Sequence, residues 1–341
     1  MSVCSERGRT ASPIGRRRWA NLLLMVALAA CAPRSNPGSI QSRPTEFPSP
    51  TPGPTATPTP SLLLIAVPEG FAASELAAWA ADHGWGVLNS DPEGASAIVG
   101  ETRVDLQAIV GFGELFGGRA AQIATDVAPV VLVEGGEIEP GPRLSTVGEP
   151  GGRHDQAGFL AGVMVGLAGQ TAGWVGLVEG TGGPLEPVYR AGFEAGVRYG
   201  CPKCQLVSLT ASEATADAFR GQGVEVVFII PGPAAAEAAA QLVEGGLWLV
   251  WVGELPTPDL RIAGQVVFAA DGLILQALDA MQAGEPGAAW PYSIGNGGIR
   301  LADVDPEAIS PGRQRLLQAA YDAVAAGQLD IGIDPVSGQE G

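Results

Sequence analysis

The sequence predicts an α/β protein with two doubly wound lobes, and three observations support this prediction. Short apolar runs typical of strands alternate with helix-like segments from Leu62 onward, as expected for parallel sheets covered by helices on both faces. About 280 residues follow Pro60, which is enough for two lobes with a substantial core. The repeated strand–helix–strand order predicts a ligand cleft at the carboxyl ends of the strands.

The expected strands are short apolar runs that stand between glycine-rich or polar segments. They are Leu62–Val67, Trp85–Leu88, Leu106–Gly111, Val130–Glu134, Gly173–Val178, Gln205–Leu209, Val224–Ile230 and Leu247–Val252. The expected helices lie between the strands, at Ala73–His83, Gly118–Ala124, Gln156–Leu167, Glu186–Tyr199, Ala211–Arg220 and Ala234–Glu244.

The amino-terminal residues predict export and a lipid anchor. The arginines Arg16–Arg18 precede an apolar run at Trp19–Ala30, which is typical of a secretory signal peptide and shorter than the roughly 20 residues of a membrane-spanning helix. Leu28–Cys31 resembles a bacterial lipobox, so we expect residues 1–30 to be removed and Cys31 to be lipidated. An ordinary signal peptide followed by an incidental cysteine is the alternative, and the export route stays open.

Residues 31–60 are dense in proline, threonine and serine and carry almost no apolar side chains. Such a segment cannot form a core and favours an extended, polyproline-like conformation. We therefore expect a tether that holds the folded part outside the cytoplasm, anchored to the cell membrane through Cys31.

The charge and the scarcity of certain side chains exclude several functions. The formal net charge is −17, which disfavours nucleic acid as a partner. Lys203 is the single lysine, and His83 and His154 are the two histidines, so we expect neither lysine-based catalysis nor a histidine-rich metal site. The sequence predicts a protein without enzyme activity, metal or cofactor.

Motifs that could carry cofactor or nucleophile chemistry are incomplete. Gly180–Gly183 and Gly111–Gly113 follow expected strands, but Leu185 and Phe116 stand where a dinucleotide fingerprint requires a third glycine. We interpret both segments as turns at the cleft edge. His154-Asp155 offers a base beside a carboxylate, yet the sequence has no Gly-x-Ser-x-Gly elbow for a nucleophilic serine.

Cys201 and Cys204 have the C-x-x-C spacing of a redox motif, which normally opens a helix after a strand. Here the pair follows helix-like Arg190–Tyr199 and precedes strand-like Gln205–Leu209. We therefore prefer a structural disulfide in a helix-to-strand turn, with the redox motif as the alternative.

Five stretches of the chain stand out because of their order. They are Asp105–Gly113, Gln156–Gly162, Ala191–Val197, Val226–Ile230, and Gly297–Leu301 with the downstream Ile309–Leu329. Together they resemble the basic membrane protein family, the purine-nucleoside-binding lipoproteins of ABC importers, over roughly Leu62 to Pro335. The resemblance implies a type I periplasmic-binding-protein architecture, in which two lobes joined by three crossings close on a ligand.

The resemblance also implies a domain organisation. We expect a substrate-binding domain at residues 61–335 and a tail at 336–341. The first lobe would comprise about 61–155 and about 255–285, and the second about 156–254 and about 286–335.

The resemblance further implies which residues bind the ligand. An aromatic residue that stacks on the base corresponds to Phe228, with Ile230 beside it, and a core role for Phe228 is the alternative. An acidic residue that binds ligand hydroxyls corresponds to Glu134, which could equally be an ordinary exposed turn residue. Phe112 lies in the loop that follows the preceding strand.

Several positions depart from the family pattern. Phe71 alone matches the ligand-contacting segment after the first strand, a ribose-binding aspartate is either replaced by Glu254 or lost, and Phe268 stands in place of a lysine. We include Phe71 and Glu254 in the expected site. Trp251 is a further candidate, although a tryptophan in a strand is usually a core residue.

Together these features predict a monomeric, extracytoplasmic substrate-binding lipoprotein that delivers a small neutral, nucleoside-like ligand to an ABC permease. Carboxylates at Glu134 and Glu254 would disfavour an anionic ligand. Two alternatives stay open: a receptor that presents its ligand to a sensor protein, and a structural lipoprotein whose cleft has degenerated.

Overall fold

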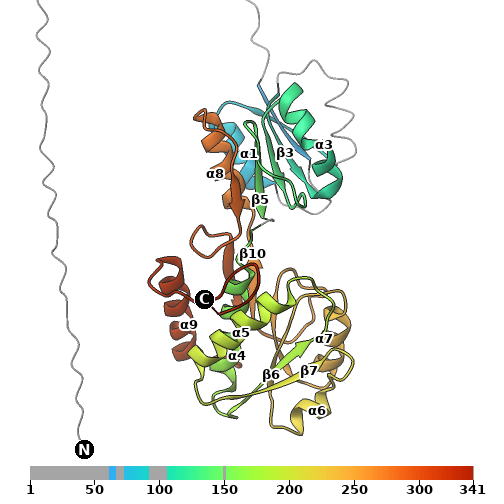
Figure 1. Ribbon diagram of the computed structural model, residues 1–341, viewed down its shortest axis with the longest axis vertical. Coiled ribbons are helices and arrows are strands. Elements are labelled where there is room, and N and C mark those ends of the chain that lie inside the picture. The colour runs from blue at the N-terminus through green and yellow to red at the C-terminus, as the bar shows by residue number, and fades with distance from the viewer. Residues whose placement is uncertain (1–60, 67–72, 92–105, 149–150, 341) are drawn as a thin grey trace, which may run out of the picture. The chain divides into compact units, whose positions relative to one another are not determined.

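The folded part of the chain contains two sheets with helices packed against them (Figure 1). The computed structural model describes residues 61–66, 73–91, 106–148 and 151–340. The expected lipidation site Cys31 and the expected ligand contact Phe71 lie outside these described residues. Within the described ranges, no helix has both the length and the apolar character that a membrane crossing requires.

The first sheet has six strands in the part of the chain that is described, in the order β11-β5-β4-β3-β1-β2. These strands are β1 (Leu62–Ala66), β2 (Gly86–Ser90), β3 (Leu106–Phe112), β4 (Val130–Val133), β5 (Leu144–Gly148) and β11 (Ala289–Pro291). All neighbouring pairs are parallel. The helices of this lobe are α1 (Ser74–Asp82), α3 (Gly113–Asp126) and α8 (Asp271–Gln282).

Both faces of the first sheet are buried by helices. Successive side chains of a strand point to opposite faces, so one strand contributes to two cores. In β1, Leu63 and Ile65 belong to the core that includes residues of α1 and α8. Leu64 and Ala66 belong to the core that includes residues of α3. Figure 1 accordingly shows α1 and α8 on one side of this sheet and α3 on the other. A strand covered on both faces is apolar throughout, which is why the run at Leu62 predicts β1 so clearly.

The second sheet also has six described strands, in the order β12-β10-β9-β8-β6-β7. They are β6 (Trp174–Glu179), β7 (Gln205–Thr210), β8 (Val226–Ile229), β9 (Trp248–Val252), β10 (Ile262–Phe268) and β12 (Ile299–Val304). Strand β12 is antiparallel to β10, and the other pairs are parallel. The helices of this lobe are α4 (His154–Gly169), α5 (Glu186–Gly200), α6 (Ala216–Arg220), α7 (Ala235–Glu244) and α9 (Pro311–Ala325).

Helices α4 and α5 pack against each other through glycines. Gly158, Gly162 and Gly166 of α4 are spaced by four residues, as are Gly192, Gly196 and Gly200 of α5. A Cβ atom at Gly162 would overlap the carbonyl oxygen of Phe193, and one at Gly196 would overlap that of Phe159. The two backbones therefore touch, and α4 is buried over almost its whole length.

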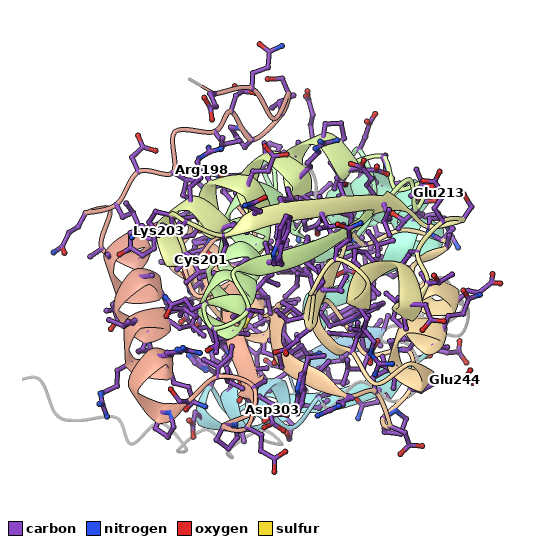
Figure 2. The ribbon with its side chains drawn as sticks, turned by 90° about the horizontal axis from the view of Figure 1, so that it is seen from below. Arg198, Cys201, Lys203, Glu213, Glu244 and Asp303 are labelled. Atoms are coloured by element: carbon purple, nitrogen blue, oxygen red, sulfur yellow. A yellow bond between two sulfur atoms is a disulfide. The ribbon has the colours of Figure 1, made fainter. Side chains whose placement is uncertain are left out.

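The turn between α5 and β7 contains the Cys201–Cys204 disulfide. The amide of Cys204 also donates to the carbonyl oxygen of Cys201 at 3.0 Å, so the turn is closed twice. Lys203 is exposed in the same turn (Figure 2). The disulfide thus joins the end of a helix to the residue before a strand and acts locally.

The structure differs from the expected lobe boundaries. Strand β10 pairs in parallel with β9 and so belongs to the second sheet, whereas the sequence predicts residues 255–285 in the first lobe. Strand β11 pairs with β5 and belongs to the first sheet, although it falls after residue 286. Backbone hydrogen bonds between neighbouring strands determine to which sheet each strand belongs. The chain therefore returns to the first lobe only after Phe268 and leaves it after Pro291.

Candidate functional site

Side chains from both lobes gather at the ends of strands and at the segments that connect the two sheets. Glu134 follows β4, Phe268 ends β10, Tyr292 follows β11, and His154 begins α4. Tyr189 joins them from the first turns of α5. We name these five residues the crossing cluster. Ligands of open α/β sheets bind outside the carboxyl ends of the strands, which makes this cluster the candidate site.

The members of the crossing cluster contact one another in a continuous chain. Tyr292 Oη donates to Glu134 Oε1 at 3.0 Å. The ring centroids of Tyr292 and Phe268 are 5.2 Å apart, and those of Phe268 and His154 are 5.4 Å apart. His154 Nδ1 lies 2.7 Å from Tyr189 Oη, within hydrogen-bonding distance. Aromatic pairs at these spacings attract each other, so the cluster is held in one arrangement.

Burial divides the cluster into an inner and an outer part. Tyr292 and His154 are buried, with exposed fractions of 3% and 7%. Phe268 is half-buried, and Glu134 is exposed. The buried members therefore support the two side chains that solvent, or a ligand, can reach.

Glu134 has an unusual backbone conformation. Its φ is 50°, and among the described residues it is the one non-glycine residue with positive φ. This left-handed conformation costs a residue with a Cβ about 1–2 kcal/mol. Its amide still donates to the carbonyl oxygen of Val147 at 3.0 Å, so the turn is closed by a backbone hydrogen bond. Such strain is concentrated at functional positions, and here it accompanies an exposed carboxylate.

The crossing next to His154 is anchored by an ion pair. Arg153 donates from Nε and Nη2 to the two carboxylate oxygens of Asp155, at 2.8 and 2.7 Å. This hydrogen bonding raises the pKa of the Arg153 guanidinium. The amide of Arg153 also donates to the carbonyl oxygen of Tyr292 at 2.7 Å, which ties two connecting segments together beside the cluster.

Phe112 and Glu254, both expected from the sequence, lie at strand ends in different sheets. Phe112 pairs with Val133, so it lies beside Glu134 at the edge of the first sheet, and it is half-buried. Glu254 follows β9 and is exposed. Its carbonyl oxygen accepts a hydrogen bond from Trp251 Nε1 at 2.8 Å, so Trp251 serves the turn rather than an open surface.

Phe228 lies in β8 and Ile230 directly after it, as the sequence predicts. Both are fully buried, and the ring of Phe228 stacks on Phe193 of α5 with centroids 5.1 Å apart. Strand β8 is central in its sheet, so both of its faces are covered and no face of the Phe228 ring reaches solvent. The core alternative is the role that the structure gives Phe228.

Sequence reasoning missed most of the crossing cluster. In the sequence, His154 stands out only as a possible catalytic base, and Phe268 only as a departure from the family pattern. Tyr292 follows a three-residue strand that carries no periodic signal. Its position beside Glu134 depends on a parallel pairing between β11 and β5, which are far apart in the sequence.

The crossing cluster and the adjacent Phe112 offer groups that can bind a small molecule. The Glu134 carboxylate can accept hydrogen bonds, and Phe112 and Phe268 are half-buried aromatic rings. Within the described ranges, no group of three or more His, Cys, Asp or Glu side chains is placed to hold a metal ion.

Comparisons with known proteins show the fold. No family model matches the sequence, and no curated protein is significantly similar to it. Solved structures of ABC transporter solute-binding proteins match, one from Conexibacter woesei DSM 14684 at TM-score 0.56 and 18% identity, covering 80% of this chain and 98% of that one. Another, from Aeropyrum pernix K1, matches at TM-score 0.50 and 16% identity, covering 80% and 93%.

A third match, described as a transcriptional activator of the comK gene from Bacillus halodurans, has a TM-score of 0.55 and 16% identity, covering 79% of this chain and 99% of that one. At such identities the likeness is one of architecture. The chain therefore has the two-lobed type I periplasmic-binding-protein fold.

Proposed function

We propose that this chain is the extracytoplasmic substrate-binding lipoprotein of an ABC importer and binds a small neutral, nucleoside-like ligand without catalysing a reaction. The fold it shares with solute-binding proteins supports the first part. One observation carries the second part: an exposed glutamate in a left-handed turn, Glu134, is held by a buried tyrosine at the edge of the first sheet.

The Glu134 carboxylate suits a ligand with neighbouring hydroxyl groups. An ionised carboxylate offers about four lone pairs on two oxygens, and Tyr292 occupies one position on Oε1. The remaining positions can accept from two hydroxyls of one sugar ring. Because Glu254 adds a second exposed carboxylate at a strand end, a neutral ligand is favoured over an anionic one.

The half-buried rings of Phe112 and Phe268 suit the flat part of such a ligand. Aromatic faces cover planar apolar groups well, and a few polar groups beside them set the orientation. We therefore assign to these two rings the stacking role expected of Phe228, and we keep Phe71 as a further proposed contact.

The amino-terminal segment supports the proposed location and partners. The signal peptide and lipobox lead us to propose a lipid anchor at Cys31, with residues 31–60 as the tether. We propose that the protein acts as a monomer and passes its ligand to an ABC permease. Neither nucleic acid nor a cofactor takes part.

Thermal unfolding of the full chain tests the proposal against purine nucleosides, nucleobases, sugars and amino acids. A ligand at one hundred times its dissociation constant stabilises the folded state by about 2.7 kcal/mol, which moves the midpoint clearly upward. We expect the largest shift with a purine nucleoside. A shift with a different class alone would contradict the nucleoside assignment, and no shift with any compound would favour the degenerate-cleft alternative.

A pair of matched variants locates the site. Glu134→Gln keeps the shape of the side chain but removes its charge, so we expect the ligand affinity to fall by about tenfold or more. Glu137→Gln makes the same change three residues away, at another exposed position, and should leave the affinity unchanged. Equal effects of the two changes would rule out Glu134 as a ligand contact.

A further inference from the structure

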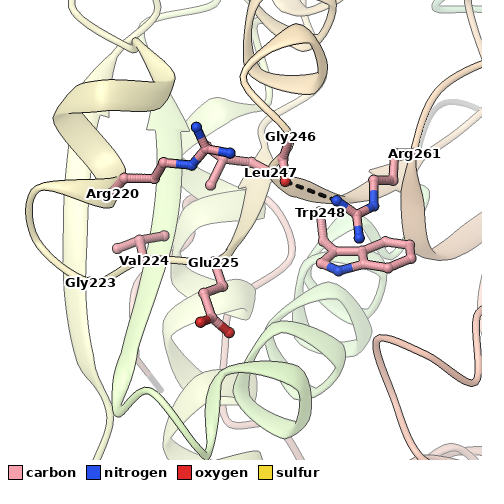
Figure 3. Close-up of a pocket in the computed structure, with 8 residues that line it drawn as sticks. All are labelled: Arg220, Gly223, Val224, Glu225, Gly246, Leu247, Trp248 and Arg261. Atoms are coloured by element: carbon pink, nitrogen blue, oxygen red, sulfur yellow. Dashed lines mark hydrogen bonds between the residues drawn. The ribbon is translucent and has the colours of Figure 1, made fainter.

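A pocket lies on the second lobe, away from the crossing cluster. Figure 3 shows the residues that line it. Its volume is about 390 Å³. Arg220 ends α6, Glu225 precedes β8, Trp248 begins β9 and Arg261 precedes β10. These strands are parallel, so the pocket lies at their amino ends, whereas Glu254 and Phe268 mark their carboxyl ends.

Two guanidinium groups converge on one peptide in this pocket. Arg261 Nη1 donates to the carbonyl oxygen of Gly246 at 3.0 Å. A Cβ atom at Gly246 would lie 2.8 Å from Arg220 Nη2, so the Arg220 guanidinium occupies the space that a side chain would fill. Gly246 also has a φ of +79°, which favours glycine. Figure 3 shows the two arginines reaching toward Gly246 from different elements.

The Arg261 guanidinium is fixed before any ligand arrives. Its Cζ lies 3.9 Å from the centroid of the Trp248 ring, a cation–π contact. Together with the hydrogen bond to Gly246, this stacking restrains a side chain that would otherwise be flexible. A planar fork held in this way loses little conformational entropy when its remaining N–H groups bind an anion.

Within the described residues, neither arginine of the pocket forms an ion pair. Arg153, Arg190 and Arg198 each bind a carboxylate within 3.0 Å. Within the residues described, no carboxylate lies within 4.0 Å of the guanidinium of Arg220 or Arg261. Glu225 lines the pocket, but its carboxylate points away from both arginines (Figure 3).

We propose that the pocket is a second binding site, which takes a phosphate group between Arg220 and Arg261. Guanidinium forks bind phosphate oxygens through paired, charge-assisted hydrogen bonds. The anionic ligand of this site would differ from the neutral ligand proposed at the crossing cluster. The phosphate can belong to free inorganic phosphate or to a phospholipid headgroup of the membrane to which we propose the chain is anchored.

Equilibrium dialysis of the full chain with inorganic phosphate, at constant ionic strength set with chloride, tests the site. We expect saturable binding with one phosphate per chain. Arg220→Gln and Arg261→Gln should each weaken it by about tenfold or more, since each removes charge-assisted hydrogen bonds. Arg261→Lys should also weaken it, because lysine keeps the charge but cannot form the fork. Arg315→Gln removes an equal charge from an exposed position on α9 and should change nothing.

Flotation with vesicles of phosphatidylglycerol distinguishes the two sources of phosphate. The full chain carries Cys31→Ser in this experiment, so that no lipid anchor holds it to the vesicles. Flotation that Arg220→Gln abolishes would identify the headgroup, and phosphate binding without flotation would identify the free ion. The proposal is overturned if the chain binds neither, or if Arg315→Gln weakens binding as much as the two pocket variants.

Discussion

The two lobes bury their helices in different ways. In the second lobe, α4 and α5 meet backbone to backbone, and Gly162 lies against the carbonyl oxygen of Phe193. In the first lobe, α3 packs on its sheet through large side chains, among them Phe116 and Ile123. A side-chain interface can adjust to a change of volume by rotamer shifts, whereas a backbone interface cannot.

This difference bears on the candidate site, because the glycine-packed helices carry two members of the crossing cluster. His154 begins α4, and Tyr189 lies near the start of α5. Their side chains approach to 2.7 Å because the backbones behind them are in contact. The glycine interface thus sets the distance between Tyr189 and His154, which in turn contacts Phe268.

The largest effect is expected when a methyl group is inserted into the glycine interface. Gly162→Ala forces α4 away from α5, so we expect the free energy of unfolding to fall by about 3 kcal/mol. Urea denaturation followed by circular dichroism measures this loss. A loss under about 0.5 kcal/mol would show that the helices can separate freely, and the contrast between the lobes would fail.

A smaller loss is expected from a change at the side-chain interface of the first lobe. Ile123→Val removes one buried methyl group from α3, which typically costs about 0.5–1.5 kcal/mol. The same denaturation experiment applies. A loss as large as that of Gly162→Ala would mean that α3 is packed as rigidly as α4.

The smallest change in the free energy of unfolding, and the only increase among the three, is expected at an exposed helical glycine. Gly118 lies within α3, and a Cβ atom there would meet nothing within 4 Å. Gly118→Ala should therefore stabilise the protein by about 0.5–1 kcal/mol, because alanine loses less backbone entropy in a helix. It is the matched control for Gly162→Ala, and destabilisation by Gly118→Ala would show that α3 is packed on this side as well.

The sequence predicts the central strands of both sheets and the helix that precedes Cys201, because these elements are apolar or amphipathic over enough residues to show their period. The sequence does not predict strand β5, helix α8 or strand β11. β5 is short and partly polar, and its side chains are buried because α3 and α8 cover the two faces of the sheet. Burial of this kind depends on neighbours that are distant in the chain.

The sequence likewise predicts only some residues of the candidate site. Glu134 and Phe112 follow apolar strands, and the ends of such strands are visible in the sequence. Phe228 has the same local pattern, yet its strand is covered on both faces, and the sequence does not distinguish an exposed strand end from a buried strand centre.

The amino-acid pattern alone predicts the class of fold, because the alternation of apolar strands and helices can be recognised from residues a few positions apart. Which side chains meet depends on the packing of the whole chain. Tyr292 donates a hydrogen bond to Glu134, and Arg220 and Arg261 each approach Gly246, because strand pairing and glycine-permitted contacts bring together residues with no periodic relation along the chain.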